Sequence, residues 1–267
     1  MLIRGSYQGA SFFELIEVDY PHLRSATRER TGADVASLSI PHGTTVLALR
    51  FADGVLMAGD RLATEGHRVA SRDMQKVYPT DGHSLVAIAG AAGPAIEMAR
   101  MLRIELEHYE KIEGEPLELE GKANKLSQMV RANLPAAMQG LVVVPIFAGY
   151  DPRRRLGRLW KFDVTGGRYE EAEFESSGSG SLYARESLKK AWRADLGRDD
   201  ALRLALQALT DAADEDRATG GVDLARGIYP IVYLCTADGS VEVAREEIER
   251  VYRDHVAIAR KPIGAGA

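Results

Sequence analysis

The chain has 267 residues, of which 45% are hydrophobic and 27% charged, and its formal net charge is −5. This composition is ordinary for a globular protein, and the acidic balance gives no sign of a nucleic-acid partner. No apolar run approaches the roughly 18–20 residues of a membrane-spanning helix, so no membrane segment is expected. A single cysteine, Cys235, excludes a disulfide within the chain and is typical of a reducing, cytoplasmic location.

The first 43 residues differ in character from the rest of the chain. Three acidic side chains interrupt the first twenty residues, where a signal peptide needs an unbroken apolar segment. Residues 1–43 show no sustained periodicity, which is typical of a leader that packs poorly by itself. Residues 261–267 read as a flexible tail. One domain is therefore expected over residues 44–260.

From residue 44 onward, the first predicted elements are strands and then helices. Two hairpins with tight turns are predicted over residues 44–51 and 55–59, and over residues 67–80 and 83–90. Two amphipathic helices follow, over residues 91–114 and over residues 117–140, the second ending near Pro135.

A second block of strands and helices completes the chain. Strands are predicted over 141–151, 157–166 and 167–177, helices over 181–192 and 199–217, a hairpin over 228–244 and a last helix over 245–260. Strands and helices come in blocks, which favours helices packed on antiparallel sheets over βαβ units. Several strands are apolar along their whole length, so both of their faces are expected to be buried. The predicted fold class is α+β, a four-layer αββα sandwich of two stacked antiparallel sheets flanked by helices.

The stretch SIPHGTTVLALRF, residues 39–51, has two interpretations. In the first, Gly43 ends a loop and β-branched Thr44 starts a strand. In the second, the Gly43–Thr44 bond is a cleavage site, and Thr44 becomes an N-terminal nucleophile. A threonine hydroxyl is a weak nucleophile that needs an adjacent base. A free α-amino group has a pKa of about 8 and can be that base, so a terminal threonine has both groups on one residue.

Three further residues have the chemistry that such a site needs. Lys76 can lower the pKa of the hydroxyl, and Asp60 lies at the end of the strand predicted to pair with that of Thr44. Gly90, at a strand-to-helix turn, can offer an unobstructed backbone N–H to an oxyanion. Each residue taken singly also has an ordinary structural interpretation.

Taken together, the motifs resemble the β subunits of the 20S proteasome, which are N-terminal threonine hydrolases. They are TTVLALRFADGVLMAGDRLAT, SRDMQKVYPT, LVAIAGAAG, SSGSGSLYA and DEDRATGGVD, in the family's order over nearly all of residues 44–255. The resemblance implies the Ntn-hydrolase fold and a leader, residues 1–43, removed by autolysis. It implies Thr44 as the nucleophile, Asp60 and Lys76 as its charged partners and Gly90 as the oxyanion donor.

The resemblance implies three more polar residues near the α-amino group. Ser179 and Asp216 would hydrogen-bond close to it, and Thr219 keeps a hydroxyl where the family commonly has serine. The segment SSGSGS has two other interpretations: a flexible linker, or serines that cap the helix starting near Leu182.

The resemblance also implies a substrate pocket, and its lining residues in this sequence are all apolar. They are Ala63, Met74, Ile88, Ala92 and Ile96. Such a pocket should accept apolar or aromatic P1 side chains, because a charged one would be desolvated without a partner. A core position is the alternative for Met74 and Ile88.

The implied function is that of a threonine endopeptidase in the proteasome core particle, degrading unfolded or tagged proteins. The implied partners are heptameric rings of α subunits in an α7β7β7α7 particle, neighbouring β subunits, a ring ATPase activator and tagged substrates. No cofactor or metal is expected, because no metal-ligand cluster or nucleotide loop appears in the sequence. Two alternatives stay open: an HslV-type threonine peptidase, whose chains are shorter, and a non-catalytic ring subunit of the same fold.

Overall fold

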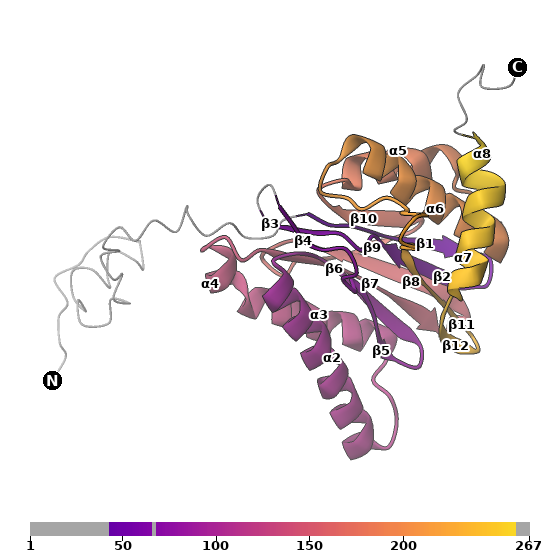
Figure 1. Ribbon diagram of the computed structural model, residues 1–267. Helices are drawn as coiled ribbons and strands as arrows, with labels where there is room; N and C mark the ends of the chain where they lie inside the picture. Colours follow the sequence, from indigo (N-terminus) through magenta and orange to yellow (C-terminus); the bar gives the residue numbers. More distant parts are fainter. Residues whose placement is uncertain (1–42, 66–67, 260–267) are drawn as a thin grey trace, which may run out of the picture. The chain divides into compact units, whose positions relative to one another are not determined.

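In the computed structural model of the chain, residues 43–65 and 68–259 are described. They form two five-stranded antiparallel sheets that stack face to face, with helices on both outer faces (Figure 1). The α+β class and the four-layer arrangement are confirmed. Of the predicted segments, the leader up to residue 42 and the tail 261–267 lie outside the described residues.

The first sheet contains the strand that follows Thr44. Its strand order is β10 (Phe174–Gly178), β1 (Thr45–Phe51), β2 (Gly54–Gly59), β11 (Ile231–Thr236) and β12 (Gly239–Glu242). Successive residues of β1 face opposite layers. Leu47 and Leu49 belong to the core beneath the helices, whereas Val46 and Ala48 belong to the core between the sheets. Burial on both faces explains why this strand is apolar at nearly every position.

The second sheet follows sequence order from edge to edge. Its strands are β5 (Val77–Asp81), β6 (Ser84–Gly90), β7 (Val143–Asp151), β8 (Leu156–Phe162) and β9 (Arg168–Glu171). Leu85, Ile146 and Leu159 share the inter-sheet core with Met57 of β2. Lys76 directly precedes β5, so the packing of the two sheets brings it toward the start of β1.

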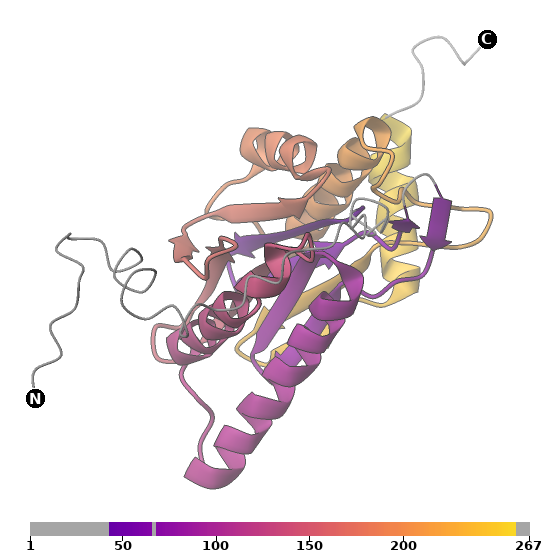
Figure 2. The same ribbon diagram turned by 90° about the vertical axis from the view of Figure 1, so that its left-hand side faces the viewer.

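The helices form the two outer layers, as Figures 1 and 2 show. The second sheet is covered by α2 (Ala92–Glu113) and α3 (Leu119–Ala132), which the short α4 (Leu134–Ala137) follows. The first sheet is covered by α5 (Ser181–Ala191), α6 (Arg198–Glu215) and α7 (Arg245–Val251). The chain continues from α7 through a π-helical turn, η3 (Tyr252–Val256), into α8 (Ala257–Ala259).

Two predicted strands are each two strands in the structure. Within residues 67–80, β4 (Arg68–Ser71) pairs with β3 (Ala63–Glu65) as a separate small sheet, and only β5 joins the second sheet. Within residues 167–177, β9 and β10 lie in different sheets. The chain crosses from one sheet to the other between them. Alternating hydrophobicity marks a strand but not the sheet it joins, because pairing partners lie far away in the sequence.

The predicted helix 117–140 is interrupted. It ends at Ala132, and Pro135 lies in the first turn of α4. A proline has no N–H for the helical hydrogen bond, and its ring clashes with the preceding turn. The predicted end near Pro135 is therefore correct to within one turn, and the continuation into residues 136–140 is only a short separate helix.

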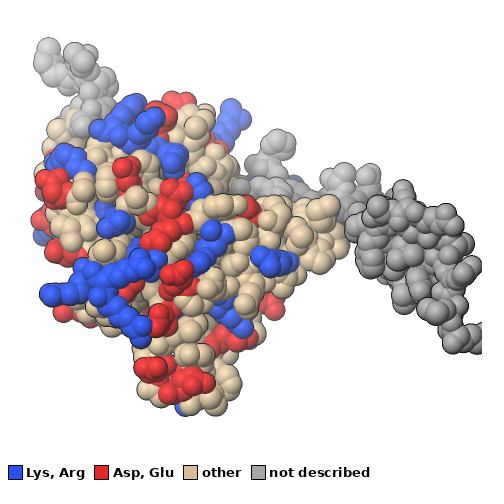
Figure 3. All heavy atoms as spheres, turned by 180° about the vertical axis from the view of Figure 1, so that it is seen from behind, with Lys and Arg blue, Asp and Glu red and all other residues tan. Residues whose placement is uncertain are grey.

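The surface combines both signs of charge. Figure 3 shows basic and acidic side chains interspersed over one face of the molecule. Ion pairs join neighbouring helices, such as Lys125 to Glu105 at 2.9 Å and Arg198 to Glu247 at 2.5 Å. Exposed pairs of this kind each contribute about 0–1 kcal/mol. None of the helices within the described ranges is long and apolar enough to cross a membrane.

Candidate active site

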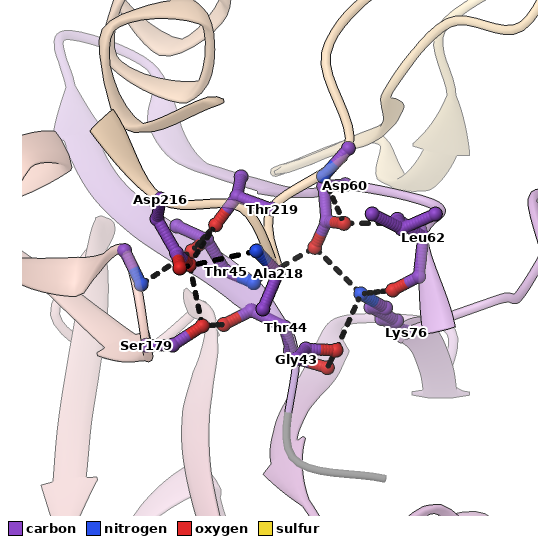
Figure 4. A network of polar contacts seen from close by, with 12 residues as sticks. Gly43, Thr44, Thr45, Asp60, Leu62, Lys76, Ser179, Asp216, Ala218 and Thr219 are labelled. Carbon is purple, nitrogen blue, oxygen red and sulfur yellow. Dashed lines mark hydrogen bonds and ion pairs between the residues drawn. The ribbon is translucent and has the colours of Figure 1, made fainter. Parts of the chain in front are cut away.

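Thr44 lies directly before β1, with its hydroxyl against the peptide bond that precedes it. The Thr44 Oγ1 donates to the carbonyl oxygen of Gly43 at 2.6 Å, and Lys76 Nζ donates to the same oxygen at 3.4 Å (Figure 4). The predicted nucleophile and the predicted cation therefore meet at the carbonyl of the predicted cleavage site.

Gly43 has no room for a side chain. A Cβ at this position would lie 2.5 Å from Thr64 Oγ1 and 2.6 Å from the Cβ of Ala218. The close contacts on both sides fix the Gly43 carbonyl against Thr44 and Lys76. The glycine that precedes Thr44 is thus a packing requirement of this site.

Lys76 and Asp60 form a buried ion pair at 2.6 Å, with side chains 2% and 0% exposed. Lys76 also donates to the Leu62 carbonyl at 2.5 Å. Burial lowers the pKa of Lys76, while Asp60 opposes that shift by attraction and hydrogen bonding. The Asp60 carboxylate thus holds the Lys76 ammonium beside the Gly43 carbonyl oxygen.

Backbone donors hold the Asp60 carboxylate in place. Its Oδ1 accepts from the Thr45 N–H at 2.7 Å, and its Oδ2 accepts from the N–H groups of Leu62 and Gly220 at 2.9 and 2.8 Å. Together with Lys76, these donors engage both oxygens. The carboxylate therefore has one orientation, set by the end of β2 and by the segment after α6.

A second polar cluster lies on the other side of Thr44. Asp216 Oδ2 accepts from the hydroxyls of Ser179 and Thr219 at 2.5 and 2.6 Å. The Ser179 N–H donates to the Thr44 carbonyl at 2.9 Å, which places this cluster beside the main chain of Thr44. The structure thus brings Ser179 together with Asp216, 37 residues later in the sequence, and with Thr219.

The segment SSGSGS is neither a linker nor a serine cap. Its first residues complete β10, and α5 begins at Ser181 after Gly180, with no side-chain hydrogen bond capping the helix. Gly178 has φ +105°, and a Cβ there would lie 1.9 Å from the Thr44 carbonyl oxygen. The glycine allows β10 to approach Thr44 and the start of β1 closely.

Gly90, the predicted oxyanion donor, ends β6 with φ +121°. A Cβ there would lie 2.1 Å from the Val142 carbonyl oxygen, so only glycine fits this turn. Gly90 lines the same pocket as Thr44 and Lys76. The structure therefore places its backbone within the candidate site.

All five residues predicted to form the substrate pocket line one cavity beside Thr44. They are Ala63, Met74, Ile88, Ala92 and Ile96. Ile88 is also part of the core beneath α2, so its two interpretations are compatible. Gln75, Tyr78 and Ala95 line the cavity as well and were not predicted.

Sequence reasoning missed the residues that act through their backbone. Leu62 offers its carbonyl to Lys76, and the N–H groups of Leu62 and Gly220 donate to Asp60. Because nearly every residue has these backbone groups, the residue type does not indicate such a role. Thr45 was predicted only as a strand residue, yet its hydroxyl lies 2.6 Å from that of Thr219. The pair of adjacent hydroxyls at the strand start was the signal available in the sequence. Within the part of the chain that the structure describes, no group of metal-ligating side chains is found.

Comparison with known proteins shows similarity along most of the chain. A family model described as proteasome subunit matches residues 40–225. A protein from Streptomyces griseus named proteasome subunit beta is 51% identical over 249 residues, covering 90% of this chain and 88% of that protein. A protein of the same name from Acidimicrobium ferrooxidans is 51% identical, covering 91% of this chain and 88% of that protein. Another, from Stackebrandtia nassauensis, is 49% identical, covering 93% of this chain and 90% of that protein.

Proposed function

Because the chain belongs to the proteasome subunit family, we propose that it is a catalytic β subunit with Thr44 as its nucleophile. One observation supports this above all others: the Thr44 hydroxyl and Lys76 both contact the Gly43 carbonyl, beside an apolar cavity. The HslV-type alternative is not favoured, since relatives named proteasome subunit beta match over nearly their whole length. The joint presence of Thr44, Asp60, Lys76 and Gly90 argues against a non-catalytic ring subunit.

The first reaction of the site is cleavage of its own chain between Gly43 and Thr44. The Thr44 oxygen attacks the Gly43 carbonyl carbon and the C–N bond breaks, so that the acyl group passes to the oxygen while the hydroxyl proton passes to the Thr44 nitrogen. Water then hydrolyses this ester, which leaves the leader with a carboxylate and Thr44 with a free α-amino group. The Lys76 hydrogen bond to the Gly43 carbonyl oxygen supports this step by stabilising negative charge there.

Peptide cleavage then repeats this chemistry on a substrate carbonyl. The α-amino group of Thr44 takes the hydroxyl proton as the oxygen attacks, and the Gly90 N–H binds the oxyanion. Lys76, held by Asp60, stabilises the charge that develops on the attacking oxygen. Asp216, with the hydroxyls of Ser179 and Thr219, orients the amine. The α-amino group passes its proton to the substrate nitrogen as the C–N bond breaks and the first peptide product leaves. Water then hydrolyses the ester, which releases the acyl group and restores the Thr44 hydroxyl, without a cofactor or metal.

The names of the relatives support assembly into a core particle. We place this chain in a β ring, flanked by copies of itself and by rings of α subunits in an α7β7β7α7 arrangement. A ring ATPase would unfold tagged substrates and deliver them to the Thr44 sites. Cytoplasmic location, the single domain 44–260 and the removable leader are parts of the same proposal.

The test is the intact mass of the protein after co-assembly with its α partner. We expect a species that begins at Thr44, together with cleavage of fluorogenic peptides. A wild-type chain that keeps residues 1–43 through complete assembly, and cleaves no peptide, would contradict the proposal.

The cavity predicts the specificity of peptide cleavage. Peptides with Tyr or Leu at P1 should be cleaved at least about tenfold faster, in kcat/KM, than peptides with Arg or Asp, because a charge would be buried unpaired. The measurement compares four reporters that differ only at P1. Met74→Arg should raise cleavage after Asp, whereas Ile112→Arg, at an exposed site outside the cavity, should leave the order unchanged. Faster cleavage after Arg or Asp by the wild-type protein would refute this assignment.

A further inference from the structure

Thr45 is fully buried, and its side chain lies among polar groups of the site. Its hydroxyl accepts from the Gly180 N–H at 3.0 Å and lies 2.6 Å from the hydroxyl of Thr219. A buried hydroxyl whose hydrogen bonds are satisfied holds one orientation. Thr45 is therefore a fixed polar contact beneath the nucleophile.

Counting protons gives a direction to this chain of hydrogen bonds. A carboxylate only accepts, so the 2.6 Å contact of Thr219 with Asp216 uses the single proton of the Thr219 hydroxyl. The proton in the Thr45–Thr219 contact must then come from Thr45. The chain thus runs from the Gly180 N–H through Thr45 and Thr219 to the carboxylate of Asp216. Each donation fixes the rotation of the hydroxyl that follows.

The backbone of Thr45 reaches the other half of the site. Its N–H donates to Asp60 Oδ1 at 2.7 Å, the same oxygen that accepts from Lys76. Thr45 therefore touches both polar clusters, the one containing Lys76 and the one containing Asp216. Since it is bonded to Thr44, a change at Thr45 alters how the nucleophile lies between them.

The packing around Gly180 shows how closely the two hydroxyls are held. A Cβ at Gly180 would lie 2.5 Å from both Thr45 Oγ1 and Thr219 Oγ1. The φ of Gly180 is −87°, which any residue can adopt, so space and not backbone conformation requires glycine here. The start of α5 is thus shaped to accept the pair of hydroxyls.

We propose that Thr45 is a positioning residue for peptide cleavage: by donating to Thr219, it holds the Asp216 carboxylate in place beside Thr44. The inference rests on the proposed function, because it assigns a role within that site. The proposed role requires the hydroxyl group of Thr45, and a side chain of the same volume without a hydroxyl cannot fulfil it. Thr45 does not line the substrate cavity, so its replacement should change kcat and not KM.

The test compares Thr45→Val, which keeps the shape, with Thr45→Ser, which keeps the hydroxyl. Both are co-assembled with the α partner, and kcat is referred to the fraction of chains beginning at Thr44, determined by intact mass. Thr45→Val should lower kcat about tenfold, the scale of one lost hydrogen bond, with KM changed less than twofold. Thr45→Ser should stay within about threefold of the wild type. Equal activity of Thr45→Val and wild type would overturn the inference.

A double-mutant cycle tests whether Thr45 acts through Thr219. In a Thr219→Val background, adding Thr45→Val should lower kcat by less than a further twofold, because the series of hydrogen bonds from Thr45 to Asp216 is already interrupted. Independent, multiplicative losses would overturn the inference. Gly180→Ala offers a separate test if Thr45→Val does not assemble, since its methyl group pushes the hydroxyls apart and should lower kcat similarly. Full activity of Gly180→Ala would also overturn it.

These outcomes are distinct from failure of the proposed function. If the wild-type particle processes its leader and cleaves peptides while Thr45→Val matches it, only the role of Thr45 is wrong. If the wild type does neither, the proposed function itself is wrong.

Discussion

The Thr44→Ala variant is expected to keep residues 1–43 and to lose peptide cleavage by a factor of about 10⁴ or more. Alanine removes the oxygen that contacts the Gly43 carbonyl and leaves every other contact of the site available. Both the cleavage of the leader and the later cleavage of substrates need that oxygen. Intact mass after co-assembly and the rate on a fluorogenic peptide measure the two effects on one sample.

Two comparison variants sharpen this prediction. Thr44→Ser keeps a hydroxyl and should still release the leader, with a reduced rate on peptides. Thr165→Ala removes a threonine hydroxyl from an exposed turn, where it contacts Asp163, and should behave as the wild type. If Thr44→Ala still yields a chain starting at residue 44, another group or a separate protease performs the cleavage.

Replacement of Lys76 by methionine should abolish peptide cleavage and lower the free energy of unfolding by about 3–5 kcal/mol. The stability loss arises because Asp60, fully buried, is left without its counter-charge. The loss of activity arises because no cation remains beside the Thr44 hydroxyl and the carbonyl that it attacks. Urea unfolding of the precursor and peptide assays of the assembled particle measure the two effects.

The matched control is an ion pair of the same length on the surface. Lys111 and Glu107 also lie 2.6 Å apart, but their side chains are 71% and 55% exposed. Lys111→Met should therefore change stability by less than about 0.5 kcal/mol and leave activity intact. A double variant, Asp60→Asn with Lys76→Met, should recover part of the lost stability without activity. Recovery of activity in that double variant would show that the ion pair serves only the fold.

Much of the site could be predicted because its chemistry depends on residue type. A hydroxyl, a lysine, a carboxylate and two glycines occur in motifs with characteristic spacing, and the structure brings Thr44, Asp60, Lys76 and Gly90 to one cavity or its border. The four layers were predictable for a related reason. A strand that is apolar on both faces must be packed against other elements on both sides. Because strands and helices alternate in blocks along the sequence, a second sheet and a layer of helices are available for this packing.

What the sequence could not predict depends on contacts between distant segments. The crossing between β9 and β10 divides one apparent strand between two sheets, and no local pattern distinguishes it. The N–H groups of Leu62 and Gly220 reach Asp60 from separate loops, and any residue type could supply them. Thr45 reads as an ordinary β-branched strand residue until its partner, 174 positions later, is known.

The same long-range contacts set an order of events during synthesis. Thr44, Asp60 and Lys76 leave the ribosome early, but the Gly180 N–H that binds Thr45 follows 135 residues later and the Gly220 N–H that binds Asp60 follows 160 residues later. Contacts across such separations form late, because closing a long loop costs entropy before any contact repays it. In the proposed mechanism, bond cleavage at Thr44 must wait until the last third of the domain has folded around the first. Release of the leader would then show that a newly made chain has already completed its fold.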